Sequence, residues 1–294
     1  MEVTRWLLAT LLLSSGRLWS QASSYRRPAL LIDTQRLAQL LSSPDLRLLD
    51  ARPPEEYRLG HLPGAVNLPA LSTDDLEANR RGFPLPPEKA EQLFRAAGIS
   101  SNSQVVIYDD QGNRFAARVF YVLQFFGHPH VQVLNGGFKK WQSERLPLTT
   151  DSPAIPLGDF KPQANSAIIA TCDWVKAHLK DPQVKLLDAR SPAEFKGERI
   201  QGPRGGHIPG AVNLEWTRVV DSGEIKTFLD APSLEKLFSD AQVLPSQEVV
   251  TYCQMGVRAA ELYFALRLLG FERVRIYDGS WEEWSAATDL PVEK

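Results

Sequence analysis

The sequence predicts an α/β fold made of two similar domains, each a mostly parallel sheet with helices on both faces. Two observations lead to this prediction: the chain of 294 residues contains a long internal repeat, and each copy alternates short apolar strands with helices. Buried apolar strands that are joined by helices are typical of parallel sheets covered on both sides. The paired segments are residues 47–57 with 185–195, 60–68 with 206–214, 105–109 with 249–253, and 133–141 with 276–284.

The elements of the first copy follow from capping residues and apolar runs. Asp33 caps a helix that runs to about Leu41, and a short helix is expected near Glu55. The other expected elements of this copy are strands 46–51, 65–67, 104–108 and 131–134, helices 87–97 and 114–127, and a last helix through Trp141. The second copy repeats this order from Thr171, which caps a helix containing Cys172.

The repeat also predicts the domain boundaries. Copies of this length indicate duplicated domains rather than a solenoid of small units. We expect one domain over residues 28–145 and another over residues 166–294. The segment 146–165 between them contains four prolines and few large apolar side chains, which is typical of a linker that runs over the surface.

Residues 1–22 have the pattern of a targeting segment. Arg5 precedes an apolar run over residues 6–13, which is too short to span a bilayer but suits the core of a signal peptide. Small residues before position 23 suit cleavage after Ala22 and predict export to the periplasm or the outside of the cell. The alternative is a mitochondrial transit peptide, because this end of the chain also has several arginines and serines and only Glu2 as an acid before Asp33.

Composition excludes several classes of function. The net charge is −2 and the isoelectric point is about 6.2, so no excess of basic residues indicates nucleic acid or an anionic membrane as a partner. Two cysteines form no disulfide framework, and the five histidines lack a recognised ligand spacing, so we expect no metal and no cofactor. We expect a monomer that acts on small molecules and, once the targeting segment is removed, does not bind membranes.

The most informative stretch is the loop of residues 253–258, which starts with Cys253. An apolar, β-branched run precedes it, and a helix that ends before Gly270 follows it. In parallel sheets, ligands bind at the carboxyl ends of the strands, which is where this cysteine lies. Inward-turned amides and the positive end of the helix dipole favour a thiolate and bind anions, so the loop predicts a nucleophilic Cys253. The alternative is a small buried residue at the end of a strand.

These motifs together resemble the tandem-domain sulfurtransferases of the rhodanese superfamily. They are the paired D-A-R and G-H-[IL]-P-G-A segments, the C-Q-M-G-V-R loop and the terminal Y-D-G-S-W-E-E-W, and the resemblance spans about Leu30 to Glu293. It implies a flavodoxin-like sheet in each domain and one active cysteine in the second domain. It also implies that a donor such as thiosulfate or 3-mercaptopyruvate loads this cysteine with sulfane sulfur as a persulfide, from which cyanide or a thiol removes the outer sulfur.

Carried over residue by residue, the resemblance assigns the persulfide to Cys253. The repeat places Asp109 opposite Cys253, and an aspartate cannot carry sulfur, so the first domain is expected to be catalytically silent. Cys172, inside a helix, is expected to be structural. The resemblance assigns the cradle of backbone N–H groups around the sulfur to Gln254, Met255, Gly256, Val257 and Arg258.

Three further arginines are candidates for the site. Arg199 and Arg204 lie in a segment that is eight residues longer than its counterpart in the first copy, and the family implies that such arginines bind the charged end of the donor. One of these arginines commonly sits where this chain has Glu194. Arg190 is expected to support the loop. The alternatives are solvated loop arginines for the first two and an ion pair with Asp188 at the end of a strand for Arg190.

Two other classes of protein use the same fold. A cysteine phosphatase needs five residues between its cysteine and its arginine, whereas four separate Cys253 from Arg258, so a phosphate would fit poorly. A binding module without activity is the other alternative, and the intact cysteine argues against it.

The loop favours thiosulfate as the donor. Gln254 and Met255 are neither the two cations of thiosulfate-specific animal relatives nor the Gly-Ser of mercaptopyruvate-specific ones. Without that serine, no group in the loop assists the proton movement that mercaptopyruvate requires. Arg258 makes the loop resemble that of bacterial members that use thiosulfate. The alternative donor is 3-mercaptopyruvate.

Overall fold

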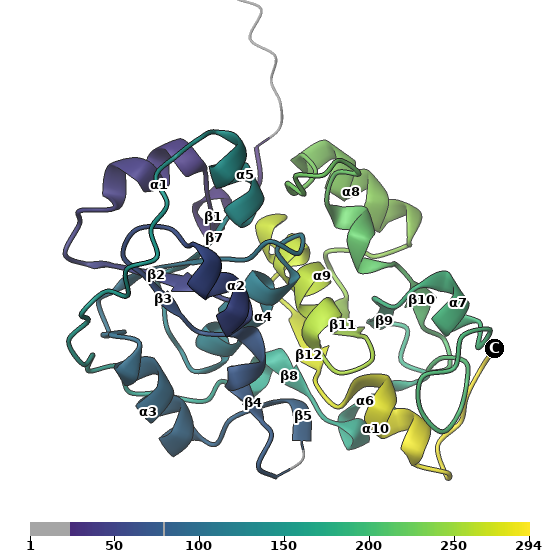
Figure 1. The fold of residues 1–294 in the computed structure, drawn as a ribbon. Coiled ribbons are helices and arrows are strands. Elements are labelled where there is room, and N and C mark those ends of the chain that lie inside the picture. Colours follow the sequence, from purple (N-terminus) through teal and green to yellow (C-terminus); the bar gives the residue numbers. More distant parts are fainter. Residues whose placement is uncertain (1–23, 79) are drawn as a thin grey trace, which may run out of the picture.

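The computed structural model describes residues 24–78 and 80–294, and it divides them into two halves of the same architecture (Figure 1). The predicted targeting segment of residues 1–22 lies outside the described residues. Within the described ranges, no helix is both long enough and apolar enough to cross a membrane.

Each half contains one five-stranded sheet in which all neighbouring strands are parallel. The first sheet has the strand order β1-β7-β6-β2-β3 and is formed by β1 (Leu31–Ile32), β2 (Leu46–Asp50), β3 (Ala65–Asn67), β6 (Gln104–Tyr108) and β7 (Val131–Leu134). The second has the order β8-β12-β11-β9-β10 and is formed by β8 (Ile169–Ala170), β9 (Val184–Asp188), β10 (Val212–Asn213), β11 (Glu248–Tyr252) and β12 (Val274–Tyr277). The two orders correspond strand by strand, so the predicted fold class is confirmed.

Helices cover both faces of each sheet. Successive residues of β6 show this, because Val105 and Ile107 belong to one apolar cluster and Val106 belongs to another on the opposite face. The first half contains η1 (Pro28–Leu30), α1 (Thr34–Leu40), α2 (Pro54–Leu59), η2 (Ala70–Thr73), α3 (Pro87–Ala96), α4 (Arg114–Phe125) and α5 (Gly137–Ser143). The second contains η3 (Ser166–Ile168), α6 (Cys172–His178), α7 (Pro192–Phe195), η4 (Trp216–Val219), α8 (Ala231–Asp240), α9 (Val257–Leu268) and α10 (Ser280–Ala286).

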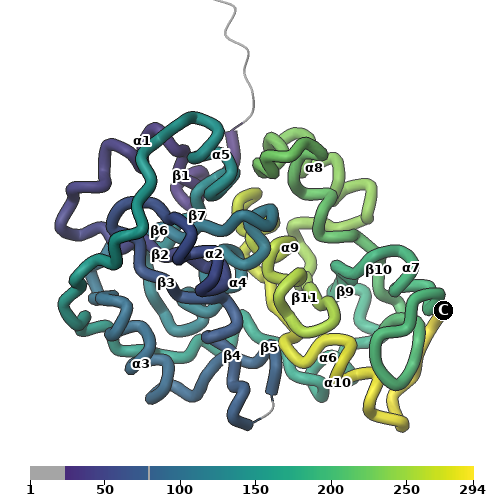
Figure 2. Tube along the Cα trace, viewed as in Figure 1, coloured from purple at the N-terminus to yellow at the C-terminus, as the bar shows by residue number. Residues whose placement is uncertain are grey.

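Besides β1 and the 3-10 helices η1 and η2, a hairpin of the first half has no counterpart in the sequence-based prediction. It is an antiparallel hairpin of β4 (Asp74–Asp75) and β5 (Arg80–Pro84). Its strands are short and polar, so they lack the alternation of apolar residues that would predict them from the sequence. In Figure 2 the hairpin lies beside α10 of the second half, at the boundary between the two sheets.

The segment 146–165 contains no helix or strand, in keeping with a linker that runs over the surface. It is nevertheless attached to the first half. Phe160 is buried against Phe94, and the backbone of Gly158 lies so close to the carbonyl of Ile99 that a Cβ at this position would collide with it.

The repeated G-H-[IL]-P-G-A motif serves the fold of both halves. The ring of His207 stacks on Phe195 with centroids 3.6 Å apart, and its Nδ1 lies 2.9 Å from the carbonyl oxygen of the same residue. His61 stacks on Tyr57 in the corresponding place of the first half. These histidines therefore tie the segment after β2 and β9 to the following turn and are not catalytic candidates.

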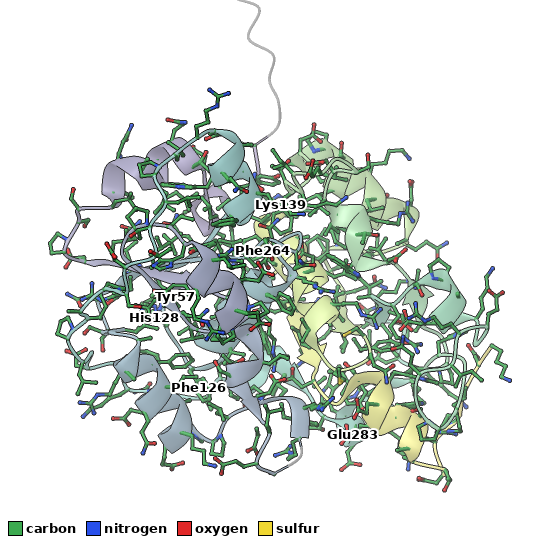
Figure 3. All side chains as sticks on the ribbon, in the orientation of Figure 1. Tyr57, Phe126, His128, Lys139, Phe264 and Glu283 are labelled. Atoms are coloured by element: carbon green, nitrogen blue, oxygen red, sulfur yellow. The ribbon has the colours of Figure 1, made fainter. Side chains whose placement is uncertain are left out.

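The two halves share one hydrophobic core along α4 and α9. A single cluster of buried apolar side chains runs from the first sheet through both helices to the second sheet. Phe120 of α4 meets Phe264 of α9 edge to face, with centroids 4.7 Å apart, and Figure 3 labels Phe264 at this boundary. All residues of α9 from 259 to 266 are fully buried, as expected of a helix that is apolar on all sides.

One polar residue interrupts this interface. Glu261 of α9 is fully buried, and neither of its carboxylate oxygens has a hydrogen-bond partner within the described ranges. Burial raises its pKa well above 4.5, and the charge of Asp109 raises it further against the opposing effect of Arg114. The folded protein therefore keeps a proton that the unfolded chain releases.

Replacing this acid should stabilise the protein at neutral pH. Because the folded pKa of Glu261 is raised, the free energy of unfolding falls as pH rises from about 4.5 toward that pKa. Glu261→Gln should flatten this dependence and raise the free energy of unfolding at pH 7 by roughly 1–3 kcal/mol. Denaturant unfolding between pH 4 and pH 8 measures it. Glu235→Gln, an exposed change on α8, is the control, and equal slopes in both variants and the wild type would contradict the account.

Candidate active site

The stretch of residues 253–258 connects β11 to α9 and includes the first two residues of the helix, which the sequence-based prediction placed in the loop. Gly256 caps α9 with φ = +78°, a conformation that glycine adopts without strain, and the helix begins at the next residue. Cys253 therefore lies at the carboxyl end of the central strand, in front of a twelve-residue helix. Its side chain is buried, with 1% of the residue exposed.

Ser280 holds both ends of this loop. Its Oγ accepts hydrogen bonds from the backbone N–H groups of Cys253 (3.2 Å) and Gly256 (3.1 Å), and it donates its own hydrogen to the carbonyl of Tyr277 (2.8 Å). Ser280 has φ = +52°, which a residue other than glycine rarely adopts. The corresponding Gly137 of the first half has φ = +55°. The strain at Ser280 thus accompanies a hydroxyl that organises the loop.

The loop leaves several backbone donors open. The carbonyl of Cys253 accepts from the N–H of Trp281 at 3.0 Å, which fixes the start of the loop on α10. Among the described residues, no acceptor is found for the N–H groups of four residues around the cysteine, namely Gln254, Met255, Arg258 and Ala259. Unpaired amides at a helix N-terminus bind anions, so the arrangement is suited to negative charge at or next to the sulfur.

The first half has a corresponding loop, one residue longer before its helix, in which a carboxylate occupies the backbone N–H groups. The carboxylate of Asp109, which the repeat places opposite Cys253, is 1% exposed. It accepts hydrogen bonds of 2.7–2.9 Å from four backbone N–H groups, those of Gln111, Asn113, Phe115 and Ala116. Burial raises the pKa of Asp109, and these four bonds act in the opposite direction. Each carboxylate oxygen stands two bonds beyond Cβ, the distance along the chain at which a persulfide carries its outer sulfur.

Arg258 pairs with Glu194 of α7. Its Nη1 and Nη2 donate to Oε2 and Oε1 at 2.8 and 2.9 Å, a fork that binds the carboxylate at both oxygens. Burial alone would raise the pKa of Glu194, but Arg258 and the hydroxyl of Ser191 lower it to about 2. The pKa of Arg258 is raised despite burial, first by Glu194 and then by the charge of Cys253. The guanidinium of Arg258 is therefore already neutralised by a carboxylate.

Arg190 supports the loop only indirectly. Its guanidinium binds Asp188 at 2.6–3.0 Å and the carbonyl of Gly206 at 2.8 Å, and it is 1% exposed. It also stacks over the ring of Trp281, 4.6 Å from the centroid. Arg52 makes the corresponding contacts in the first half, so the repeated D-A-R motif closes a strand end in both domains. A direct contact between Arg190 and a donor is not compatible with this pairing.

The two arginines of the longer segment differ from each other. Arg204 donates to four backbone carbonyls at and after the end of α10, those of Trp284, Ser285, Ala287 and Leu290, at 2.6–2.9 Å. This corrects the prediction that it forms a rim for the donor, because its hydrogen bonds close a helix end. Arg199 is exposed, and its side chain has no hydrogen bond or ion pair within the described part of the chain. It remains the candidate for contact with an anion.

The other predicted residues line or support the loop. The amide of Gln254 donates to the carbonyl of Gln201 at 3.2 Å, which brings the longer segment against the loop, and Val257 donates to the carbonyl of Met255 at 3.0 Å. Cys172 lies at the first position of α6, where burial raises the pKa of its thiol. No cluster of three or more metal-ligating side chains occurs in residues 24–78 and 80–294.

Sequence reasoning missed two contributors to the site. Ser280 stands in the Y-D-G-S-W motif. The available signal was the glycine at the corresponding position of the first copy, Gly137, because glycine there indicates a position with positive φ. The other is Gly82 of β5, whose backbone abuts the loop from the first half: a Cβ there would lie 2.3 Å from the carbonyl oxygen of Met255. No local pattern announces that contact.

Comparison with known proteins matches both halves. The model of the rhodanese-like domain matches residues 33–144 and 171–287. A thiosulfate sulfurtransferase of Azotobacter vinelandii is 36% identical over 267 residues, covering 90% of this chain and 97% of that relative. A 3-mercaptopyruvate sulfurtransferase of Escherichia coli is 34% identical over 277 residues, covering 87% and 95%. The crystal structure of a 3-mercaptopyruvate sulfotransferase from Escherichia coli superposes with a TM-score of 0.78 at 28% identity, covering 86% and 98%.

Removing the hydroxyl of Ser280 should disturb the thiol without unfolding the protein. Ser280→Ala leaves the N–H groups of Cys253 and Gly256 without their acceptor. The midpoint of the pH profile for alkylation of Cys253 by iodoacetamide should rise by about one pH unit, or ~1.4 kcal/mol. Ser285→Ala is the matched control, since this buried serine of α10 has no partner for its Oγ within the described residues. Identical profiles for both variants would contradict the role of Ser280.

Breaking the pair of Arg258 and Glu194 should lower stability. Arg258→Ala leaves a buried carboxylate without its partner, so the free energy of unfolding at pH 7 should fall by about 3 kcal/mol. Because the folded pKa of Glu194 is depressed to about 2, the wild-type stabilisation is present above pH 4.5 and is lost as pH falls toward 2. The variant should lack this acid-dependent loss.

The double variant Arg258→Ala/Glu194→Ala tests the same pair from the other side. It removes both charges and should recover most of the lost stability in urea unfolding. Lys236→Ala, which breaks an exposed pair with Asp240 on α8, is the control and should change stability by less than about 1 kcal/mol. A double variant no more stable than Arg258→Ala would refute the pairing argument.

Proposed function

The chain belongs to the rhodanese family of sulfurtransferases, as a tandem of two rhodanese-like domains, and we propose that it takes sulfane sulfur from thiosulfate onto Cys253 and passes it to a thiophilic acceptor. The observation that carries the proposal is the loop of residues 253–258. It offers open backbone N–H groups beside the sulfur. Its side chains include no histidine, carboxylate or hydroxyl that could move a proton for the donor.

The open amides support a persulfide on Cys253. In the first domain the equivalent ring of N–H groups is filled by the carboxylate of Asp109, an anion two bonds beyond Cβ. A persulfide anion carries its charge at the same number of bonds from Cβ. The loop of the second domain therefore matches a group that Cys253 has only after it has received a sulfur atom, which is the requirement for a sulfur carrier.

The first half-reaction with thiosulfate balances without a proton. The Cys253 thiolate attacks the outer sulfur of thiosulfate, a new S–S bond forms, and the original S–S bond breaks to release sulfite with its electron pair. Three negative charges enter and three leave, divided between the persulfide and sulfite. The protein has to stabilise charge only, which backbone N–H groups do well in a buried site.

The alternative donor places a different demand on the loop. With 3-mercaptopyruvate the C–S bond breaks, and the proton of the donor thiol has to reach the carbon that becomes the methyl group of pyruvate. Gln254, Met255 and Val257 do not titrate, and Ser280 already donates its hydrogen to the carbonyl of Tyr277. This favours thiosulfate, while the exposed Arg199 is available to the anionic end of either donor.

The second half-reaction returns the enzyme to its starting state. A nucleophile such as cyanide attacks the outer sulfur, and the S–S bond breaks with its electron pair on Cys253, giving thiocyanate and the thiolate. A thiol acceptor reacts in the same way. No redox cofactor is needed in either step, because sulfane sulfur moves between nucleophiles.

Steady-state kinetics with the two donors test the choice. With cyanide as acceptor, we expect thiosulfate to give the higher kcat/KM and 3-mercaptopyruvate to be a weaker donor. The physical reason is that only the latter needs a proton shuttle. A kcat/KM at least tenfold higher for 3-mercaptopyruvate, equal to about 1.4 kcal/mol, would overturn the donor assignment but leave the sulfurtransferase class intact.

The nucleophile is tested by substitution and mass measurement. Cys253→Ser should abolish sulfur transfer while the protein remains folded, because a serine hydroxyl cannot accept sulfane sulfur. After treatment with thiosulfate, the wild-type protein should carry one extra sulfur atom on a peptide containing Cys253. Cys172→Ser is the matched control and should keep its activity. Extra sulfur on Cys172, or an active Cys253→Ser protein, would refute the assignment.

A further inference from the structure

The buried guanidinium of Arg118, on α4 of the first domain, joins the two domains beside the active-site loop. Its Nη1 donates to Asp278 Oδ1 at 2.8 Å, and its Nη2 donates to Asp74 Oδ1 at 2.9 Å and to the carbonyl of Gly82 at 2.6 Å. Arg118 and Asp278 are fully buried, and Asp74 is 3% exposed. Because Asp278 belongs to the second domain, this ion pair crosses the domain interface.

The hairpin of the first domain lies directly on the loop. A Cβ on Gly82 would be 2.3 Å from the carbonyl oxygen of Met255 and 3.0 Å from that of Asp278. A hydrogen bond within the hairpin stabilises it, because Asp74 Oδ2 accepts from the N–H of Gly82 at 2.9 Å. On the loop itself, a Cβ on Gly256 would lie 3.3 Å from Asp278 Oδ1 and 3.5 Å from Arg118 Nη1. Arg118 therefore contacts both walls between which the loop turns.

Asp278 connects this ion pair to the hydroxyl that shapes the loop. It stands two residues before Ser280, whose Oγ binds the N–H groups of Cys253 and Gly256. Tyr121, one turn along α4 from Arg118, donates its hydroxyl to the other carboxylate oxygen of Asp278 at 2.9 Å. Two side chains of the first domain thus hold the carboxylate of Asp278 in place. They thereby hold the backbone that leads to the strained Ser280.

The charge of Asp278 depends on the same partner. Burial raises its pKa to about 6, while Arg118 and the hydroxyl of Tyr121 act to lower it. The guanidinium of Arg118 therefore favours the ionised form of the Asp278 carboxyl, which burial disfavours. The position of the Asp278 carboxylate is therefore coupled to the first domain through charge as well as geometry.

We propose that Arg118 is a positioning residue of the active site, which acts through Asp278 and the carbonyl of Gly82 to hold the loop of residues 253–258 with its amides open around Cys253. The first domain, although it carries Asp109 in place of the cysteine, thereby supplies the back wall of the site in the second domain. The proposal rests on Cys253 being the reactive thiol, and it holds for any sulfur donor.

Arg118→Lys tests the geometry while keeping the positive charge. A lysine ammonium cannot reproduce the planar fork that spans two carboxylates and a carbonyl. In a Cys172→Ser background, we expect the midpoint of Cys253 alkylation to shift by about one pH unit, and kcat/KM with thiosulfate to fall at least tenfold. Hydrogen exchange of the peptide containing residues 253–258 should become several-fold faster.

Tyr121→Phe keeps the proposal testable if Arg118→Lys fails to fold. It removes a single hydrogen bond to Asp278 and leaves all the charges in place. We expect smaller changes in the same direction in Cys253 alkylation and in exchange of the loop. The value of kcat/KM should fall about threefold.

The matched control breaks an equivalent bond at the other loop. Asn113 of the first domain donates its Nδ2 to the carbonyl of Lys226 in the second domain at 2.9 Å, beside the loop that carries Asp109. Asn113→Gly removes this bond and tolerates the native φ of +72°. It should speed hydrogen exchange around residues 109–116 and leave the alkylation profile of Cys253 and kcat/KM unchanged.

Loop exchange and alkylation at wild-type values in Arg118→Lys, or equal changes in Asn113→Gly, would overturn the proposal. A specific effect of Arg118→Lys on the loop of the second domain supports it. Since neither readout needs a sulfur donor, a protein that is inactive with thiosulfate would refute the proposed donor and still report the effect of Arg118.

Discussion

Backbone amides at the start of a buried helix need an acceptor, and this requirement governs both halves of the molecule. Where β6 meets α4, the carboxylate of Asp109 satisfies four N–H groups at once. Where β11 meets α9, Cys253 stands in that place and the neighbouring amides stay open. The loop of the first domain, which is one residue longer before its helix, is therefore closed by its own carboxylate, whereas the loop of the second domain keeps open N–H groups that suit an anion.

Each loop is also completed by the opposite domain. Gly82 of the first domain packs on the carbonyl of Met255, and Trp216 and Lys226 of the second domain pack within 3.5 Å of a Cβ placed on Gly112. The apolar cluster along α4 and α9 holds the two domains against each other, so these contacts are maintained by packing. The first domain, which carries Asp109 at the position of Cys253, therefore forms one side of the loop in the second domain.

Three arginines near the loop have their positive charge compensated by other groups of the protein. The guanidiniums of Arg190 and Arg258 are each paired with a carboxylate, and Arg204 is occupied by backbone carbonyls. The pair of Arg258 and Glu194 adds little net charge, although the arginine lies close enough to Cys253 to respond to it. Recognition of an anion at the sulfur therefore falls mainly to backbone N–H groups, which are fixed by the fold and need no reorganisation.

The sequence by itself determined the two-domain α/β fold, the order of the longer helices and strands, and the loop that carries Cys253. These features depend on local signals, because apolar runs, caps such as Asp33 and the repeat itself act over a few residues. The existence of the helix after the loop and the presence of Asp109 opposite Cys253 were readable in the same way, although the helix begins at Val257, inside the expected loop.

Only the tertiary structure decided what surrounds the sulfur. Arg204 carries the same charge whether it faces a donor or the end of α10, and the choice depends on carbonyls that lie about eighty residues away in sequence. Glu194 and Arg258 find each other across 64 residues, and the polar hairpin that brings Gly82 onto Met255 has no apolar period to reveal it. Hydrogen bonds and buried ion pairs depend on which residues lie close in space, whereas helices and strands depend mainly on residues that are neighbours along the chain. The sequence therefore singled out Cys253 as the candidate nucleophile, and the packing of the two domains determined its environment.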